Sequence, residues 1–356
     1  AGLYIFQLYQ NFSDCLRFYR NIKKIHEQLF LFRDYIKRVI ENIDKHLLIS
    51  DKLECYQEFN YTLREKKEIL QELLSKLEDI TPYKLNMAKI NNIGQLMKCY
   101  YIVFDNKLYN DAIVYSMGFT GYIETLNNLN YNIEGKFIGK CSYTDKSTKF
   151  KNSYYCPLVK FNNKIIKNSY CLKKNKIITG PNASGKTTLL KSTLFNIILS
   201  QQIGFGFYSN AKINVYDYVH CYLNIPDTSG RDSLFQAEAR RCKEILDNVI
   251  KNKDKRHFCI FDELYSGTNP YEAISGAYAY LSYLTKYKNF NFLLTTHYVS
   301  LCEKVDKNKM IENAHMIINL NKETKNDKLN YTYKLGKGIS KIKGGINVFR
   351  NLDYPT

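Results

Sequence analysis

Apolar positions in the first part of the chain recur at spacings of three and four residues, which is the period of an α-helix. Over residues 12–48 they form one stripe, made of Ile22, Ile25, Leu29, Phe32, Ile36, Val39 and Ile43. A second stripe comprises Leu53, Tyr56, Leu63, Leu70, Leu73, Leu77 and Ile80. Ser50 and Asp51 lie between the stripes and offer a break followed by a new N-cap. The pattern predicts either a long antiparallel helical pair or two helices of a larger bundle.

The periodicity changes further along the chain. Residues 83–130 predict shorter helices, and the glycines in SMGFTGY, residues 116–122, predict a turn between two of them. Short β-like runs follow from about 134, namely KFIGKCSY, YYCPLVKF, KIIKNSYCL and KIIT. After 179, helix and strand patterns alternate, and MIINLN and NYTYKL predict a β-hairpin. We therefore expect an α-helical lever or connector region over 1–132 and an α/β domain over 133–356.

Charge adds information about partners. The chain of 356 residues has a net charge of +18, and residues 144–176 contain nine lysines and one acidic residue, Asp145. Such a basic chain favours a polyanionic partner, either nucleic acid or an anionic membrane surface. A lysine-rich solubilising surface is the alternative. Charge by itself does not separate DNA from RNA.

The ten cysteines are scattered from Cys15 to Cys302 without a Cys-x-x-Cys pair or a zinc-type spacing. This pattern predicts reduced thiols and hence an intracellular protein, in the cytoplasm, nucleus, an organelle or a viral factory. No apolar run reaches 18 residues, so we expect no membrane span. The chain starts at Ala1 rather than Met, which is compatible with a fragment of a longer protein.

The stretch ITGPNASGKTT, residues 178–188, lies between an apolar strand-like run and a helix-like run. It satisfies the P-loop pattern G-x-x-x-x-G-K-[ST], in which glycines let successive backbone N–H groups face phosphate oxygens. Lys186 is expected to reach the β- and γ-phosphates, and the Thr187 hydroxyl to ligate Mg²⁺. The predicted cofactors are therefore ATP and Mg²⁺. The predicted nucleotide-binding residues are Gly180, Pro181, Asn182, Ala183, Ser184, Gly185, Lys186, Thr187 and Thr188.

Two further strand ends carry polar side chains. HFCIFDE, residues 257–263, predicts a buried strand that ends in Asp262, for the Mg²⁺ shell, and Glu263, to orient or deprotonate the attacking water. NFLLTTH ends in His297, which can hydrogen-bond the γ-phosphate or that water. Taken alone, Asp262 and Glu263 would be interpreted as solvated acids, and His297 as a structural histidine. Their order after the phosphate loop is typical of ABC-type P-loop ATPases.

These residues resemble the MutS ATPases of DNA mismatch repair. The matching blocks, in the family's order, are ITGPNASGKTT, DSLFQAEARRCKEIL, FDELYSGTNPYEAISGAYAYLSYL, LLTTHY and YKLGKGISKIKGGINVFRNLDYP. The resemblance covers roughly residues 135–356 and implies an ABC-type P-loop ATPase fold. The helical pair in the first 80 residues resembles the family's lever helices by pattern only.

The resemblance also implies roles for single residues. Ser233 stands where the family's signature serine reaches across a dimer to the partner's nucleotide, and Glu238 matches the acid that follows it. Gly267 and Thr268 match the loop after the catalytic acids. The implied protein is an ATPase in DNA mismatch repair or a related repair or recombination process. It would form a homodimer or a MutS-like heterodimer and contact the backbone of double-stranded DNA.

The chain departs from the family pattern in several respects. The signature reads Ser233-Leu-Phe-Gln-Ala-Glu238, so the neighbours of its serine and acid are altered. The aromatic residue that stacks on adenine has three unranked candidates, Tyr154, Tyr155 and Tyr170. The mismatch-reading Phe-x-Glu is missing, because the only such sequence is the acidic strand end at 261–263. These departures leave an alternative open: a nucleotide-dependent clamp or scaffold on DNA or on an RNA-rich particle, with little turnover. The double-strand-break-repair and chromosome-organising ATPases are disfavoured, since no long insertion separates Lys186 from Asp262.

Overall fold

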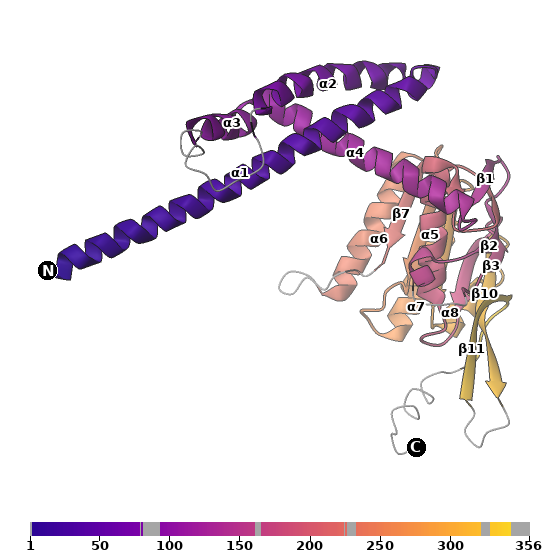
Figure 1. Ribbon diagram of the computed structural model, residues 1–356. Helices are drawn as coiled ribbons and strands as arrows, with labels where there is room; N and C mark the ends of the chain where they lie inside the picture. Colours follow the sequence, from indigo (N-terminus) through magenta and orange to yellow (C-terminus); the bar gives the residue numbers. More distant parts are fainter. Residues whose placement is uncertain are drawn as a thin grey trace. The chain divides into compact units, whose positions relative to one another are not determined.

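The computed structural model describes residues 2–78, 80, 93–160, 165–223, 225, 233–321 and 328–342. Along these residues the chain is helical first and mixed α/β afterwards (Figure 1). It divides into two compact units, Ala1–Asn130 and Tyr131–Thr356. We call the first the helical unit and the second the α/β unit.

The helical unit contains four α-helices among its described residues: α1 (Gly2–Ser50), α2 (Gln57–Leu77), α3 (Ile93–Asp105) and α4 (Lys107–Glu134), the last of which continues into the α/β unit. Side-chain contacts show that α1 and α2 are antiparallel. Asp51, just after α1, pairs with Arg64 in the first half of α2. Arg33, in the middle of α1, donates to the carbonyl oxygen of Ile80, beyond the end of α2. The apolar stripe of each helix therefore faces the other.

The core of the helical unit is made largely of these stripes. It gathers aliphatic side chains from α1 and α2 together with residues of α3 and α4, because an amphipathic helix gains stability by burying its apolar face. The buried members include Leu29, Ile36, Val39, Ile43, Leu63, Leu70, Leu73, Leu77, Leu96, Ile113 and Phe119.

The predicted break at Ser50 and Asp51 is confirmed, but the predicted N-cap is wrong. Helix α2 begins after Tyr56, whose side chain makes no capping hydrogen bond. The Asp51 carboxylate instead accepts from Asn60 Nδ2 at 2.8 Å and pairs with Arg64. Ser50 Oγ donates to Asn60 Oδ1 at 3.0 Å. These polar side chains bind the body of α2 and so are not available to its first N–H groups.

The predicted turn at 116–122 is also wrong, because α4 runs through it without interruption. A Cβ atom at Gly118 or Gly121 would meet nothing within 4 Å, so neither glycine is required by a tight turn. Buried Ser116 and Phe119 hold this part of the helix in the core. Their packing outweighs the roughly 1 kcal/mol that each helical glycine costs relative to alanine.

The α/β unit is organised around a six-stranded sheet in the order β11-β10-β4-β9-β8-β7. All neighbouring pairs are parallel except β10 and β11, which form the hairpin predicted from MIINLN and NYTYKL. The strands are β4 (Asn175–Thr179), β7 (Tyr218–Tyr222), β8 (His257–Asp262), β9 (Phe290–Thr296), β10 (Ile311–Asn321) and β11 (Lys328–Lys337). The helices of this unit are α5 (Lys186–Ile203), α6 (Leu234–Lys251), α7 (Pro270–Leu284) and α8 (Val299–Val305).

The central strands are buried on both faces, as expected for parallel strands covered by helices. In β8, Phe258 and Ile260 pack into the cluster that contains the apolar residues of α5. The alternate residues Cys259 and Phe261 pack into the cluster on the other face, with residues of α6, α7 and α8. This two-sided burial explains why the strand is apolar at nearly every position before its acidic end.

A second sheet of five strands has the order β3-β2-β6-β1-β5. Its strands are β1 (Gly139–Tyr143), β2 (Lys149–Ser153), β3 (Asn168–Cys171), β5 (Phe205–Gly206) and β6 (Asn210–Ile213). The predicted strand in YYCPLVKF is wrong over the described residues of that run, because Cys156–Lys160 form a 3₁₀ helix. Pro157 has no N–H group to donate to a strand ladder. Phe161 of that run lies outside the described residues.

None of the helices described above is both long enough and apolar enough to cross a membrane.

Candidate functional site

The glycine-rich loop connects β4 to α5 at the carboxyl edge of the six-stranded sheet. Lys186 is the first residue of α5, and Gly185 precedes it with a φ of 92°. A Cβ atom at Gly185 would also lie 3.1 Å from a ring carbon of Tyr333. The positive φ favours glycine here, and an added Cβ would also make the Tyr333 ring of β11 shift slightly. The loop delivers the N-terminus of α5, with its partial positive charge, to this edge.

Lys186 is buried, with 6% of its surface exposed. Its Nζ lies 3.3 Å from the carbonyl oxygen of Pro181 and 3.1 Å from His297 Nε2. Burial lowers the pKa of Lys186, and the nearby carboxylates of Glu263 and Asp262 oppose this effect in part. An ammonium group held in this way gains most from a ligand with several negative oxygens.

Asp262, at the end of β8, meets two hydroxyl groups. Thr187 Oγ1 donates to Asp262 Oδ2 at 3.0 Å, and Thr295 Oγ1 of β9 donates to the other carboxylate oxygen. Among the described residues no three His, Cys, Asp or Glu side chains gather as a metal site. Mg²⁺ commonly takes one or two protein oxygens and completes its shell with phosphate oxygens and waters. The Thr187–Asp262 pair fits that donor set.

Glu263 and His297 form a contact beside Lys186. His297 Nε2 lies 2.9 Å from Glu263 Oε1. The hydrogen bond from His297, with the positive charges of His297 and Lys186, lowers the pKa of Glu263, while burial acts in the opposite direction. The same histidine nitrogen faces the ammonium and the carboxylate. It can donate to Glu263 when it carries a proton, or accept from Lys186 when it does not.

The backbone at Glu263 is unusual, since its φ is 54°. Non-glycine residues in this left-handed region carry a strain of about 1–2 kcal/mol. The N–H of Glu263 still donates to the carbonyl oxygen of Thr295 at 3.1 Å, so the residue remains tied to the end of β9. Backbone strain of this kind clusters at functional sites.

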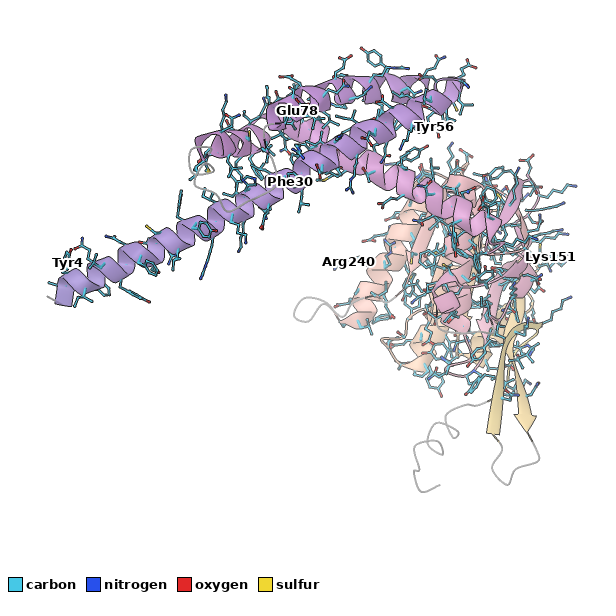
Figure 2. All side chains as sticks on the ribbon, viewed as in Figure 1. Tyr4, Phe30, Tyr56, Glu78, Lys151 and Arg240 are labelled. Carbon is cyan, nitrogen blue, oxygen red and sulfur yellow. The ribbon has the colours of Figure 1, made fainter. Side chains whose placement is uncertain are left out.

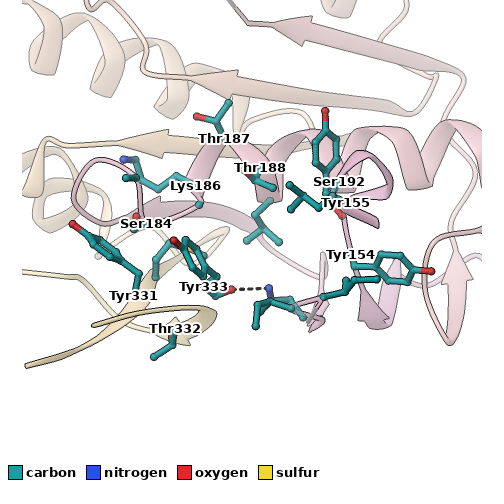
Figure 3. A pocket seen from close by; sticks show the side chains of 18 of the residues that line it. Tyr154, Tyr155, Ser184, Lys186, Thr187, Thr188, Ser192, Tyr331, Thr332 and Tyr333 are labelled. Carbon is teal, nitrogen blue, oxygen red and sulfur yellow. Dashed lines mark hydrogen bonds between the residues drawn. The ribbon is translucent and has the colours of Figure 1, made fainter. Parts of the chain in front are cut away.

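A cavity of about 750 Å³ opens over the glycine-rich loop. Its lining includes loop residues 182–188, Glu263 and the β11 residues Tyr331, Thr332 and Tyr333. Figure 3 shows Ser184, Lys186, Thr187 and Thr188 together with these three β11 residues. Ser184 Oγ is buried in this region without a hydrogen-bond partner among the described residues. A buried hydroxyl without a partner is costly, so this atom fits a cavity that takes a polar ligand.

The structure separates the three tyrosine candidates for base stacking. Tyr154 and Tyr155 line the cavity (Figure 3). Tyr170 does not line it, because it is buried in the apolar cluster beneath the five-stranded sheet, with its hydroxyl 2.7 Å from Thr193 Oγ1. Tyr331 and Tyr333 were not predicted. The alternation in NYTYKL places both on one face of a strand, which was the available signal.

The start of α6 approaches the acidic strand end. A second cavity of about 310 Å³ is lined by residues that include Leu234, Glu238, Asp262 and Glu263. Ser233 is the N-cap of α6 in a capping box: Gln236 N donates to Ser233 Oγ at 3.3 Å, and the Gln236 side chain accepts from Ser233 N. Ser233 lines neither of these two cavities.

Glu238 is almost fully buried and binds the loop that follows the acids. One carboxylate oxygen accepts from Ser266 N at 3.0 Å and from Ser266 Oγ at 2.8 Å. The other accepts from Gly267 N at 3.1 Å. A Cβ atom at Gly267 would lie 2.8 Å from Phe235 N, so glycine permits the close approach of this loop to α6. Thr268 Oγ1 donates to Glu272 at the start of α7.

The chain is similar to known proteins over the same unit. The family model for MutS domain V matches residues 176–356. The DNA mismatch repair protein MutS of Persephonella marina is 26% identical over 204 residues, which cover 56% of this chain and 22% of that protein. The MutS protein of Bacteroides fragilis is 32% identical over 182 residues, covering 50% of this chain and 20% of that protein.

A eukaryotic relative is similar over a comparable stretch. The DNA mismatch repair protein Msh3 of Dictyostelium discoideum is 29% identical over 190 residues, covering 51% of this chain and 13% of that protein. The chain thus spans about a fifth or less of the length of the relatives it matches.

Proposed function

This chain belongs to the MutS domain V family, and from that premise we propose that it binds and hydrolyses ATP in the cavity over residues 180–188. The observation that carries the proposal is the convergence of three groups at one sheet edge. They are the buried ammonium of Lys186, the Thr187–Asp262 pair and the Glu263–His297 pair.

Binding of the triphosphate would use the backbone of the glycine-rich loop and the side chains of Lys186 and Ser184. The loop N–H groups and Lys186 Nζ would face the phosphate oxygens, as in P-loop sites. Ser184 Oγ would gain the partner that it lacks. The base would lie against aromatic rings, for which Tyr155 and Tyr333 line the cavity from different elements.

The chemistry would be divided among three side chains. Thr187 and Asp262 would hold Mg²⁺, which when bound neutralises charge on the phosphate oxygens. Glu263 would orient and deprotonate the attacking water, since a carboxylate within hydrogen-bond reach can accept its proton. His297 would position Glu263 through the hydrogen bond from its Nε2.

We further propose composite sites in a homodimer or a heterodimer of MutS-like chains. Ser233 is exposed at the N-terminus of α6, and its Oγ accepts from Gln236 N, which leaves the hydroxyl proton free for a phosphate. In this arrangement Ser233 would act on the partner's nucleotide. The names of the relatives favour a role in DNA mismatch repair or a related repair or recombination process on double-stranded DNA.

A second candidate function is a nucleotide-dependent clamp or scaffold on DNA or an RNA-rich particle. The Glu263–His297 contact favours it, because it engages the carboxylate oxygen that would otherwise accept a proton from water. In this case ATP would set the conformational state and slow hydrolysis would reset it.

The test measures ATP binding and turnover for the wild-type chain, Lys186→Ala and Glu263→Gln. We expect Lys186→Ala to lose binding. Glu263→Gln should keep binding and lose turnover by roughly 10²–10⁴-fold. Lys288→Ala, at an exposed position, is the matched control for lost charge. Unchanged turnover in both site variants would refute the assignment, whereas binding without measurable wild-type turnover would favour the clamp.

A further inference from the structure

The five-stranded sheet of the α/β unit has one buried and one exposed face. The side chains of Cys141, Phe150 and Ala211 point into the apolar cluster beneath it. The alternate positions on the same strands are exposed and carry four lysines. We call these the lysine face: Lys140 on β1, Lys149 and Lys151 on β2, and Lys212 on β6. Figure 2 shows Lys151 at the outer surface of the α/β unit.

The strand register places these lysines next to one another. Lys149 is directly opposite Lys212 in the antiparallel pair of β2 and β6. Lys151 is opposite Asn210, and Ser142 is beside Lys212 in the parallel pair of β1 and β6. Opposed residues of a sheet have Cβ atoms about 4.5–5.5 Å apart, and like charges at that distance destabilise the sheet. The chain keeps this unfavourable arrangement on an open surface.

Among the residues that the structure describes, no carboxylate pairs with the lysine face. The five strands of the sheet contain no Asp or Glu. None of the four lysines makes an ion pair or side-chain hydrogen bond with any other residue that the structure describes, whereas Lys67, Lys176 and Lys243 are each paired with a carboxylate. The face is therefore a concentrated positive field that no described side chain neutralises.

Turns at the edge of the sheet extend the positive charge. Lys146 lies in the turn between β1 and β2, and Lys173 and Lys174 lie in the turn between β3 and β4; all three are exposed. The acidic residue of these turns is Asp145, also exposed. The turns thus add three positive charges and one negative charge to the border of the face.

We propose that the lysine face docks on the phosphate backbone of duplex DNA. Charge complementarity carries the assignment, because closely spaced cations gain most from a dense line of fixed anions. The side chains between the lysines are Ser142 and Asn210 rather than aromatic rings, whereas proteins that bind single strands stack bases on aromatic rings. Apolar side chains that would enter a membrane are likewise absent from these positions. The inference rests on the nucleic-acid part of the proposed function.

The lysine face is distinct from the nucleotide site. None of its four lysines lines the cavity over the glycine-rich loop. Contacts of this kind would be independent of base sequence, since they reach phosphate oxygens rather than base edges. DNA would therefore bind to the α/β unit itself, at a position that the lysines of the sheet determine.

The test compares two variants with the same loss of charge. The face variant carries Lys140→Gln, Lys149→Gln, Lys151→Gln and Lys212→Gln. The control variant carries Lys253→Gln, Lys288→Gln, Lys307→Gln and Lys309→Gln, which are also exposed and unpaired among the described residues, at turns outside the five-stranded sheet. Affinity for a 30-bp DNA duplex is measured between low and physiological salt, with ATP binding and urea unfolding measured in parallel.

We expect the face variant to bind the duplex at least about tenfold more weakly at low salt. The slope of log affinity against log salt should fall by up to about 3–4, since each lost phosphate contact removes about 0.9. The control variant should keep most of the wild-type slope. Without DNA, the face variant should be at least as stable as the wild type, because its like-charge repulsion is removed.

Three outcomes would overturn the proposal. They are an unchanged slope in the face variant, an equal loss in both variants, and tighter face-dependent binding of an RNA duplex of the same length. Intact ATP binding alongside any of these would refute the lysine face and leave the nucleotide site standing. Failure of the wild-type chain to bind ATP would refute the nucleotide site instead.

Discussion

At the scale of single residues, one histidine nitrogen connects the two charges of the site. His297 Nε2 lies within hydrogen-bond distance of both Lys186 Nζ and Glu263 Oε1. A single nitrogen cannot donate to the carboxylate and accept from the ammonium at the same time. A bound phosphate would take over the ammonium, which leaves His297 to orient Glu263.

From the lowered pKa of Glu263 we predict how the stability of the fold depends on pH. Its pKa is lower in the folded chain than the ordinary value of 4.5, chiefly through the hydrogen bond from His297. The carboxylate therefore stabilises the fold above pH 4.5, and this stabilisation is lost as pH falls through the lowered folded value. We expect Glu263→Gln to flatten the loss of stability on the acid side of pH 4.5, as measured by urea unfolding. Glu303→Gln, exposed on α8, is the control, and equal curves for the two variants would contradict the prediction.

At the scale of elements, two contacts hold the surroundings of the site. The pairing of β10 with β4 brings β11 over the glycine-rich loop, where Tyr333 approaches Gly185. On the other side, Glu238 of α6 binds the backbone of Ser266 and Gly267 just after the acids. A displaced α6 would therefore move the loop that follows Glu263.

Because of the Glu238 contacts, we expect the loss of this side chain to lower the stability of the fold strongly. Glu238→Ala would leave three donors without their buried acceptor, and we expect it to lower the free energy of unfolding by about 3 kcal/mol. Glu244→Ala, on the exposed side of the same helix and paired with Arg241, should change it by less than about 0.5 kcal/mol. Denaturant unfolding of both variants measures the difference. A similar small effect in both would show that the Glu238 contacts contribute little.

Much of the candidate site was predictable at this scale, because motif residues lie at the ends of recognisable strands and helices. The apolar run in HFCIFDE places Asp262 at the end of β8, and the P-loop spacing places Lys186 at the start of α5. The glycines at 118 and 121 were misleading, because side chains packed on the other residues of α4 decide the conformation there. Propensity is a weak guide wherever tertiary packing opposes it.

At the scale of the whole molecule, the proposed composite site makes a prediction about mixed dimers. Ser233→Ala and Lys186→Ala chains should each form inactive dimers. Mixed together, they should recover about half of the wild-type turnover per mixed dimer, because one of its two sites would have both residues intact. Turnover is measured across mixing ratios. If Ser233 served the nucleotide of its own chain, every site would carry a defect and no mixture would recover activity.

The sequence by itself determined most of the strands and helices and where the motif residues lie along them. Local periodicity and spacing depend on neighbouring residues, so the glycine-rich loop, the acidic end of β8 and the histidine after β9 were visible without coordinates. The tertiary structure alone decided which distant residues meet. Strand pairing brought Tyr333 to Gly185 and placed Lys149 opposite Lys212. Such neighbours depend on the register between strands that are distant in the sequence. The burial of one face and the packing of the whole sheet select that register, and no local sequence pattern encodes it.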